Sequence, residues 1–319
     1  MGRYAAVLLL CLAALFAHAQ DARRVYRIGV LNEAWSADHP TVEGLKAGLK
    51  DLAVEDGRDV RFEIRFTQGK REALSTAAAA LVAGDVDLIV AMGPAAALAA
   101  SRATHRIPIV FTSVGDAVAA GILADRTRPG GNVTGISSLQ PELAAKRLQV
   151  LHSLAPAVRR IFVVHERNDP VAAKMLSNAA DAAKALDLEI VVRDVDDDAD
   201  LDGILAQIGP GDAIFAADDS RLRIPVAVLE RSLARRVPAI FGSALWVGHG
   251  GLVSYGPDAY AEGVQGASLV ARILAGTKPG DLPVEGAERI DLAVNLKTAE
   301  RLGLVVPRRI LLRADAFRR

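Results

Sequence analysis

The sequence contains a single cysteine, Cys11, and it has one long apolar run, at the N-terminus. Arg3 precedes that run, which extends from Ala5 to Phe16, and the following Ala17-His18-Ala19 fits the cleavage motif of a secretory signal peptide. The run is shorter than the ~20 residues that a helix needs to cross a bilayer. We therefore expect residues 1–19 to be a signal peptide. The exported chain would contain no disulfide, thiolate zinc site or cysteine nucleophile.

Aromatic residues are scarce, at 4% of the chain, and neither sign of charge is in excess, with 38 basic and 38 acidic residues. No sustained basic stretch is present, which argues against nucleic acid and anionic membrane surfaces as partners. Hydrophobic residues, mostly Ala, Val, Leu and Ile, make up 51% of the 319 residues. A chain of this length and composition can bury a large core, and two domains are favoured over one.

Motifs for nucleotide and metal binding are also missing. Asn32-Glu33-Ala34-Trp35-Ser36 lacks the glycines that let a backbone approach a pyrophosphate. Asp198–Gly203 matches the opening of a calcium loop, but Gly209 stands where the closing glutamate should be, so a solvated acidic turn is favoured. The six histidines show no paired zinc spacing. We expect neither a cofactor nor a bound metal.

One segment superficially suggests a hydrolase. Gly135-Ile136-Ser137-Ser138-Leu139 begins like the nucleophile elbow Gly-x-Ser-x-Gly, but the second glycine, which permits the tight turn, is absent. Ser137 is more consistent with a cap of the following helix. We therefore expect no enzymatic activity, and hydrolysis remains the third alternative for function.

Short apolar runs rich in β-branched residues alternate with alanine-rich helical patterns along the chain. The predicted strands are 26–31, 60–66, 86–91, 107–112, 133–136, 160–165, 188–193, 213–216, 239–241 and 290–294. The predicted helices are 39–54, 72–83, 95–104, 141–153, 170–186, 201–208, 224–235 and 260–274. Because the strands are apolar on both faces, the pattern predicts parallel sheets covered by helices on both sides, the doubly wound α/β class. The alternation occurs once before about residue 138 and once after it.

Polar residues follow the ends of the predicted strands, where the ligand crevice of an open parallel sheet lies. In the first half they are Asn32, Glu33, Trp35 and Ser36, then Gly93, and then Thr112, Ser113 and Asp116. In the second half they are Glu166 and Asn168, then Asp219, and then Trp246. A zwitterionic ligand needs hydroxyl and backbone N–H groups for its carboxylate and an acidic side chain for its ammonium group. Thr112 or Ser113 with Asp116 could supply them, and a turn or capping role is an equal alternative for Asp116.

The two tryptophans, Trp35 and Trp246, both fall on predicted loops, where an aromatic face could cover a ligand. The alternative for each is packing into a hinge or against the edge of a core, and for Trp246 this alternative is slightly favoured.

Five motifs together resemble one family. They are Phe111–Asp116, Arg128–Ser137, Ser254–Asp258, Asn295–Ala299 and Leu311–Asp315. The chain is similar in them to the substrate-binding proteins of ABC transporters, in the family that includes the tryptophan/tyrosine uptake proteins. The resemblance implies a type-I periplasmic binding protein fold, with two lobes joined by a hinge. It also implies a small ligand between the lobes, an inner-membrane ABC permease as partner, and a periplasmic monomer.

By analogy with such proteins the chain returns to its first lobe after building the second. We expect lobe one to comprise 25–138 plus 248–280, and lobe two 139–247 plus 281–319. Short crossings between the halves favour a hinge over a flexible tether.

Two positions depart from the family pattern: Asp116-Ala117-Val118 replaces Asp-Pro-Val, and Glu166-Arg167 replaces Asn-Pro. A carboxylate in place of a neutral amide alters what the second lobe can pair with. We expect a periplasmic solute-binding protein of an importer, with an amino acid or a similar small zwitterion or anion as ligand. A periplasmic sensor subunit that docks on a membrane receptor is the alternative.

Overall fold

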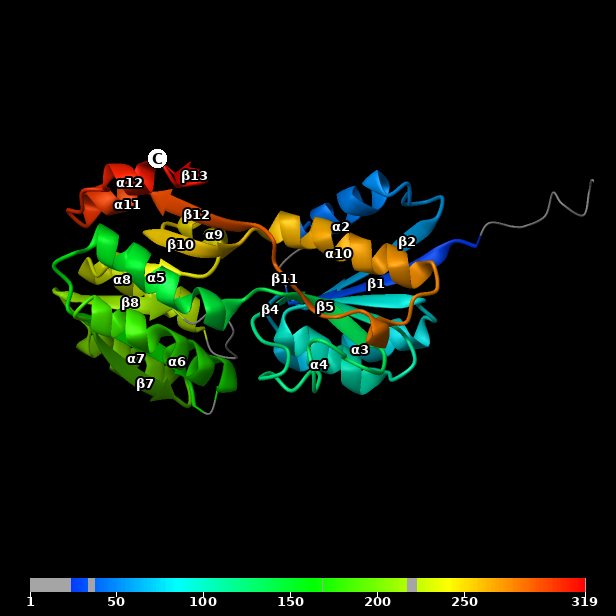
Figure 1. Cartoon of the computed structure of the whole chain (residues 1–319). Coiled ribbons are helices and arrows are strands. Elements are labelled where there is room, and N and C mark those ends of the chain that lie inside the picture. Colours follow the sequence, from blue (N-terminus) through cyan, green and yellow to red (C-terminus); the bar gives the residue numbers. More distant parts are fainter. Residues whose placement is uncertain (1–23, 34–37, 168, 217–222, 319) are drawn as a thin grey trace, which may run out of the picture.

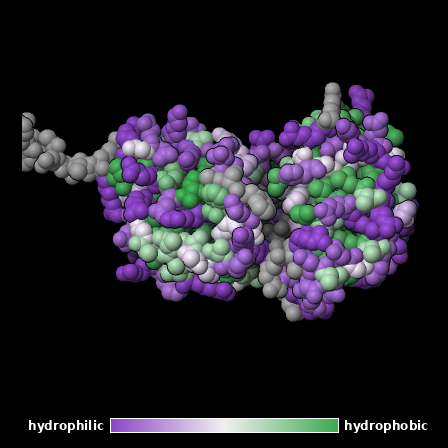
Figure 2. All heavy atoms as spheres, turned by 180° about the vertical axis from the view of Figure 1, so that it is seen from behind, coloured by the Kyte–Doolittle hydropathy of each residue, from purple (hydrophilic) through white to green (hydrophobic). Residues whose placement is uncertain are grey.

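The computed structural model describes residues 24–33, 38–167, 169–216 and 223–318. Within them the chain forms two sheets, and each sheet with its helices makes a separate lobe (Figure 1). From behind, the surface is hollowed where the two rounded bodies meet (Figure 2). No helix in the described part of the chain is both long and apolar enough to cross a membrane.

Lobe one contains a sheet with the strand order β11-β5-β4-β3-β1-β2. The strands are β1 (Tyr26–Asn32), β2 (Val60–Phe66), β3 (Leu88–Met92), β4 (Ile109–Val114), β5 (Val133–Ser137) and β11 (Glu285–Gly286). The helices are α2 (Pro40–Asp51), α3 (Leu74–Ala83), α4 (Pro94–Ala103) and α10 (Ala259–Leu274), with 3-10 turns η1 (Arg71–Ala73) and η2 (Pro279–Asp281). All the strand pairs in this sheet are parallel.

Lobe two contains a sheet with the strand order β13-β12-β10-β9-β8-β6-β7. The strands are β6 (Arg160–Glu166), β7 (Glu189–Val195), β8 (Asp212–Ala216), β9 (Ala239–Phe241), β10 (Val253–Pro257), β12 (Ile290–Asn295) and β13 (Ala316–Arg318). The helices are α5 (Gln140–Leu154), α6 (Pro170–Ala185), α7 (Asp198–Gln207), α8 (Ile224–Arg235), α9 (Ala244–Gly248), α11 (Leu296–Arg301) and α12 (Arg308–Leu311). Only the described pair β10–β12 is antiparallel. The predicted α/β class with two doubly wound, mainly parallel sheets is confirmed.

Each sheet is buried on both faces by aliphatic side chains. In lobe one, α2 and α10 cover the face that carries Val30 and Val90, and α3 and α4 cover the face that carries Leu31 and Ile89. Proline in the first turn starts α2, α4, α5, α6 and α8, where the missing N–H has no helical partner to lose. Burial of these apolar faces is the main stabilising contribution to each lobe.

Helices α2 and α10 pack with their backbones in contact. A Cβ atom at Gly44 of α2 would lie 2.0 Å from the carbonyl oxygen of Tyr260, and one at Gly263 of α10 would lie 2.1 Å from that of Thr41. Only glycine permits this separation. The contact holds the beginning of α10 against the beginning of α2, at the end of lobe one that faces lobe two.

Three crossings connect the lobes: β5 to α5, β10 to α10, and β11 to β12. They are hydrogen-bonded to one another, because Ala287 N donates to Ser137 O (2.8 Å) and Asp258 N donates to Arg289 O (3.1 Å). The chain enters lobe two from the carboxyl end of β5 and returns to lobe one from the carboxyl end of β10. The carboxyl ends of the parallel strands in both sheets are therefore turned toward the junction (Figure 1).

The strand pairings differ from the predicted lobe boundaries after residue 247. Strand β10 pairs with β9 and β12, so residues 253–257 belong to lobe two and not to lobe one. Strand β11 pairs with β5, so residues 285–286 belong to lobe one and not to lobe two. Both are short strands, and the apolar pattern of a short strand does not reveal which sheet it joins.

Candidate functional site

Three neighbouring strands of lobe one end in a row of buried side chains. Leu31 pairs with Ala91 and Met92 pairs with Thr112, so Asn32, Met92 and Thr112 lie side by side across β1, β3 and β4. Asn32 and Thr112 are each 1% exposed, and Asn32 Nδ2 lies 3.7 Å from the sulfur of Met92. The row is at the carboxyl end of the sheet, as the sequence predicted for Asn32 and Thr112.

Gly93 follows this row and begins helix α4. Its φ of 87° is in the left-handed region that favours glycine, and its N–H donates to Thr112 O (2.9 Å). Among the described residues, no side chain caps α4, and a Cβ atom at Gly93 would meet no atom within 4 Å. Pro94 has no N–H, so the first N–H groups at this end of the helix belong to Ala95 and Ala96, and a helix start of this kind is suited to a carboxylate.

Ser113 has a strained backbone at the end of β4. Its φ is 57°, in a region that non-glycine residues rarely adopt, and it lies in an irregularity of pairing between Phe111 and Val114. The Ser113 hydroxyl donates to Glu262 Oε2 of α10 at 2.9 Å. Such strain persists only where surrounding contacts hold it, and it is concentrated at functional sites.

Glu262 is a site residue that the sequence analysis missed. It is 4% exposed, and its second oxygen, Oε1, lies buried beside the Ser138 hydroxyl without a well-aligned hydrogen bond. Burial raises the pKa of Glu262 to about 7, and nearby Asp258 adds to the increase, while Ser113 and Ser138 oppose it. A signal existed in the sequence, since this carboxylate interrupts the buried stripe that Gly266, Val270 and Ile273 continue along α10.

Buried hydroxyl groups surround this position. Thr112 Oγ1 on β4 and Thr41 Oγ1 on α2 have no hydrogen-bond partner among the described residues. The methyl group of Thr112 packs toward Gly266 of α10, and Thr41 lies against Gly263. Buried polar atoms that lack partners are typical of a site that binds something polar.

Both carboxylate oxygens of Asp116 already have partners within the protein, so Asp116 is not a free acceptor for a ligand. Its Oδ1 accepts hydrogen bonds from Val118 N and Ala119 N, both at 3.0 Å, and its Oδ2 forms an ion pair with Lys174 of α6. Burial alone would raise the pKa of Asp116, but the Lys174 ammonium and the Ala119 N–H outweigh it, and the pKa is lowered. The structure supports the capping alternative and adds an ion pair that spans the two lobes.

Lobe two brings fewer of the predicted residues to the junction. Glu166 ends β6, and its carbonyl accepts a hydrogen bond from Asp169 N at 3.2 Å. Trp246 lies on α9, with its ring stacked on Phe241 (6.1 Å between centroids) and 6.3 Å from His249. Trp246 therefore packs at the edge of a core cluster, which agrees with the alternative that was slightly favoured for it from the sequence. The predicted site residues Trp35, Ser36, Asn168 and Asp219 lie outside the described residues.

Arg147 is the second buried charged residue that the sequence analysis missed. It is 1% exposed on α5, donates to Tyr255 O (2.7 Å) and to Gln140 Oε1 (2.5 Å), and lies over the ring of Phe215. Tyr255 precedes the crossing to α10 and Gln140 follows the crossing from β5. Arg147 thus connects two of the crossings on the side of lobe two.

Ser137 is not arranged as a nucleophile. Its hydroxyl donates to Gly115 O (3.0 Å) and accepts from Leu139 N (3.3 Å), and it is 1% exposed. The expectation that Ser137 caps the next helix was wrong, because α5 begins at Gln140 with Leu139 at the capping position, φ 55°. Within the described residues, no group of three or more His, Cys, Asp or Glu side chains could hold a metal ion.

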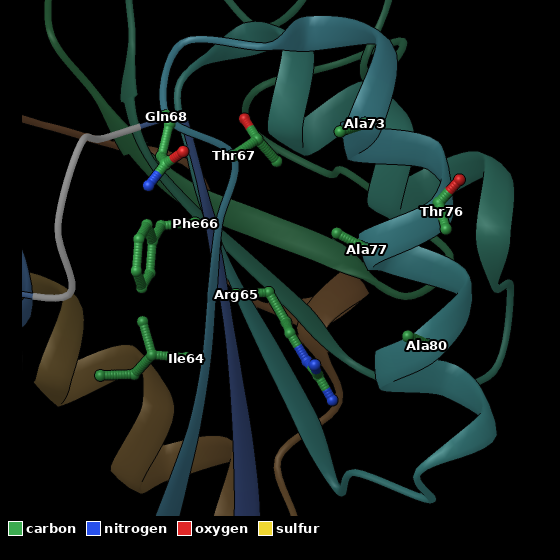
Figure 3. Close-up of a pocket in the computed structure, with 9 residues that line it drawn as sticks. All are labelled: Ile64, Arg65, Phe66, Thr67, Gln68, Ala73, Thr76, Ala77 and Ala80. Atoms are coloured by element: carbon green, nitrogen blue, oxygen red, sulfur yellow. The ribbon is translucent and has the colours of Figure 1, made fainter.

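A separate cavity of about 590 Å³ lies on the outer side of lobe one, between edge strand β2 and helix α3 (Figure 3). It is lined by Ile64, Arg65, Phe66, Thr67, Gln68, Ala73, Thr76, Ala77 and Ala80. In Figure 3, Arg65 extends along α3, whereas Ile64 and Phe66 point to the opposite side of the strand. None of the predicted site residues lines it.

Comparison with known proteins agrees with this architecture. Residues 34–318 match the family model described as ABC transporter substrate binding protein. A curated tyrosine-binding protein of Clostridioides difficile is 25% identical over 290 residues, which cover 89% of this chain and 83% of that protein.

Solved structures show the same two-lobed fold. A conserved domain protein of Vibrio cholerae is 30% identical, with a TM-score of 0.80 over 92% of this chain and 100% of the other. The ABC domain of Streptococcus pneumoniae in complex with L-Trp is 23% identical, with a TM-score of 0.81 and the same coverage, and it supports the fold alone. Because the family model covers nearly the whole chain, this protein belongs to the family of ABC transporter substrate-binding proteins.

Proposed function

We propose that the chain is the periplasmic solute-binding component of an ABC importer, and that it captures an amino acid between its two lobes and delivers it to a membrane permease. The observation that carries the proposal is the polar carboxyl end of lobe one. There the row from Asn32 to Thr112, the open start of α4 and the Ser113–Glu262 hydrogen bond meet at the face turned toward lobe two.

The ligand's carboxylate is placed at the start of α4. Helix α4 has ten residues, so its first N–H groups carry a partial positive charge directed along its axis. Gly93 leaves room for close approach, and the buried Thr112 hydroxyl beside it can donate to an anion. Recognition of a carboxylate in this way requires no cationic side chain.

Closure of lobe two over this surface would exclude water from the ligand. The three crossings and the Arg147 contacts beneath them provide a hinge, and α6 contributes the Lys174 that already reaches Asp116. Glu166 is the proposed contact of lobe two, and Asn168, Trp35, Ser36 and Asp219, which lie outside the described residues, remain predictions from the sequence. In a closed cleft each charged hydrogen bond contributes more than in water.

The ligand class is supported by one relative, the tyrosine-binding protein of Clostridioides difficile. We expect L-tyrosine, L-tryptophan or another amino acid to raise the melting temperature of the chain from residue 20 onward. A ligand that binds only the folded state stabilises it by about 2.7 kcal/mol at one hundred times its Kd. The panel should contain amino acids, small dicarboxylates, purines and sugars. A response to sugars or purines alone would contradict the amino acid assignment.

A further inference from the structure

We infer that Glu262 is the ligand-binding carboxylate for the ammonium group of the amino acid. This inference rests on the proposed function, since it assigns a role within the same site. Asp116, the residue that the sequence analysis put forward for the ammonium group, is already occupied by Lys174 and two backbone N–H groups.

The position of Glu262 suits this role. Its Oε2 accepts a hydrogen bond from Ser113, the residue after Thr112, and the carbonyl of Thr112 binds the N–H of Gly93 at the start of α4. An α-amino acid has its carboxylate and ammonium groups on one carbon atom, so the two protein contacts must lie close together. Glu262 is connected to the start of α4 through two consecutive residues of β4, Ser113 and Thr112, which is consistent with this requirement.

Glu262 has no positively charged partner within the part of the chain that the structure describes. No Lys, Arg or His of the described residues forms an ion pair with this carboxyl group, and the charged neighbour that perturbs it is another carboxylate, Asp258. A buried carboxylate is stable only when it is paired or when it takes up a proton. An ammonium group from the ligand would supply the missing countercharge.

Proton release follows from this environment. The pKa of Glu262, raised to about 7 mainly by burial, leaves the carboxyl group about half protonated near neutral pH. An ammonium group beside it would lower that pKa, so binding would release about half a proton at pH 7. The affinity for an amino acid would therefore increase from pH 6 to pH 8, by about tenfold.

Other titratable groups lie on the elements packed around Glu262. Asp258 caps α10, and α2 carries the exposed Glu43. The half-buried His39 caps α2, and desolvation lowers its pKa. The loop after β4 carries Asp116, paired with Lys174, and the third crossing carries Arg289, paired with Asp291. Of these, histidine is the residue type whose ordinary pKa lies nearest to this pH interval, so His39 requires its own control.

The test is calorimetry of L-tyrosine and of its deaminated analogue, 3-(4-hydroxyphenyl)propanoate, on the chain from residue 20. The dependence of the binding enthalpy on the ionisation enthalpy of the buffer gives the number of protons released. We expect release of about half a proton at pH 7 with tyrosine and none with the analogue. If the panel selects another amino acid, it and its deaminated counterpart replace this pair.

Variants separate the ammonium contact from general effects on folding. Glu262→Gln should weaken tyrosine binding about tenfold or more at pH 8, leave the analogue's affinity nearly unchanged, and abolish the pH dependence. Glu43→Gln and His39→Gln should retain the wild-type pH dependence. The proton count of the wild-type chain decides the question even if Glu262→Gln does not fold.

Three outcomes overturn the inference. Tyrosine binding that releases no proton and does not change from pH 6 to 8 contradicts it while the proposed function stands. Equal losses of tyrosine and analogue affinity in Glu262→Gln reduce Glu262 to a support of the site. A folded wild-type chain that binds no amino acid removes the proposed function and the inference together.

Discussion

Lys174 of lobe two forms an ion pair with Asp116 of lobe one, whose side chain is 2% exposed. The two residues are 58 positions apart in the sequence and belong to different lobes. The ion pair therefore favours the orientation of the lobes in which the two side chains meet. Because Lys174 is 45% exposed, the pair is partly screened by solvent and its contribution is modest.

Removal of this ion pair is expected to loosen the arrangement of the lobes. Lys174→Met removes the ion pair. If the pair stabilises the orientation of the lobes in Figure 1 by about 1 kcal/mol, its removal lowers the ratio of this orientation to the others by about fivefold. Small-angle scattering without ligand should show a larger radius of gyration. Lys184→Met, an exposed lysine in the last turn of the same helix, is the control and should leave the radius unchanged. Equal radii for both variants would show that the ion pair does not restrain the lobes.

The contact between α2 and α10 predicts a large effect from one added methyl group. Gly44→Ala places a Cβ atom 2.0 Å from Tyr260 O, which forces the helices apart, and we expect the free energy of unfolding to decrease by about 2 kcal/mol. Urea unfolding measures the change. Gly203→Ala is the control, because it lies in the exposed part of α7 with nothing within 4 Å, and it should stabilise slightly. A Gly44→Ala chain of wild-type stability would contradict the observed helix packing.

The buried guanidinium of Arg147 predicts a stability loss at the hinge. Arg147→Met leaves Tyr255 O and Gln140 Oε1 without their donor, so we expect the free energy of unfolding to decrease by about 3 kcal/mol. Arg301→Met, at an exposed position on α11, should change it by less than about 0.5 kcal/mol. Similar decreases in the free energy of unfolding for the two variants would show that Arg147 does not stabilise the hinge.

The raised pKa of Glu262 predicts a stability change with pH. In the folded chain the carboxyl group holds its proton up to about pH 7, whereas in the unfolded chain it ionises near the ordinary glutamate pKa of 4.5. The folded state therefore loses up to about 3 kcal/mol as the pH rises through this interval. Glu262→Gln should lack this component, so its advantage over wild type should grow from pH 4.5 to pH 7. Parallel pH profiles for the two chains would mean that Glu262 is not perturbed.

Much of the fold could be predicted because the central strands, such as β3, β4 and β8, are apolar on both faces and several helices begin with a proline or a capping residue. The predicted strands 60–66 and 239–241 and the helix 224–235 agree with β2, β9 and α8 residue for residue. Strand β1 extends one residue further than predicted, to Asn32. The prediction ended at Leu31 because Asn32 is polar, but in the structure Asn32 is buried and continues the strand.

The remaining differences in fold come from tertiary pairing. Short elements such as β11 and β13 exist only because a neighbouring strand offers free backbone groups, which a local pattern does not show. The same reason explains why the lobe boundaries after residue 247 were misplaced.

The candidate site was predicted in part. Asn32, Gly93, Thr112 and Ser113 lie at the predicted edge of the sheet, because residues after parallel strands meet there, and their role in binding stays a prediction. Glu262 was not predicted, because it comes from α10, where the chain returns to lobe one after most of lobe two has been built. The proposed role of Glu262 depends on its burial beside Ser113, which is 149 positions away in the sequence, so no local pattern reveals it.

The central claim is that the chain captures an amino acid and releases it unchanged. The most direct test is small-angle scattering of the chain from residue 20 with and without the amino acid that gives the largest thermal shift, followed by mass analysis of the recovered ligand. The account predicts that the radius of gyration decreases at saturation and that the ligand is recovered intact. A radius that no amino acid changes, or a ligand recovered as a reaction product, would contradict it.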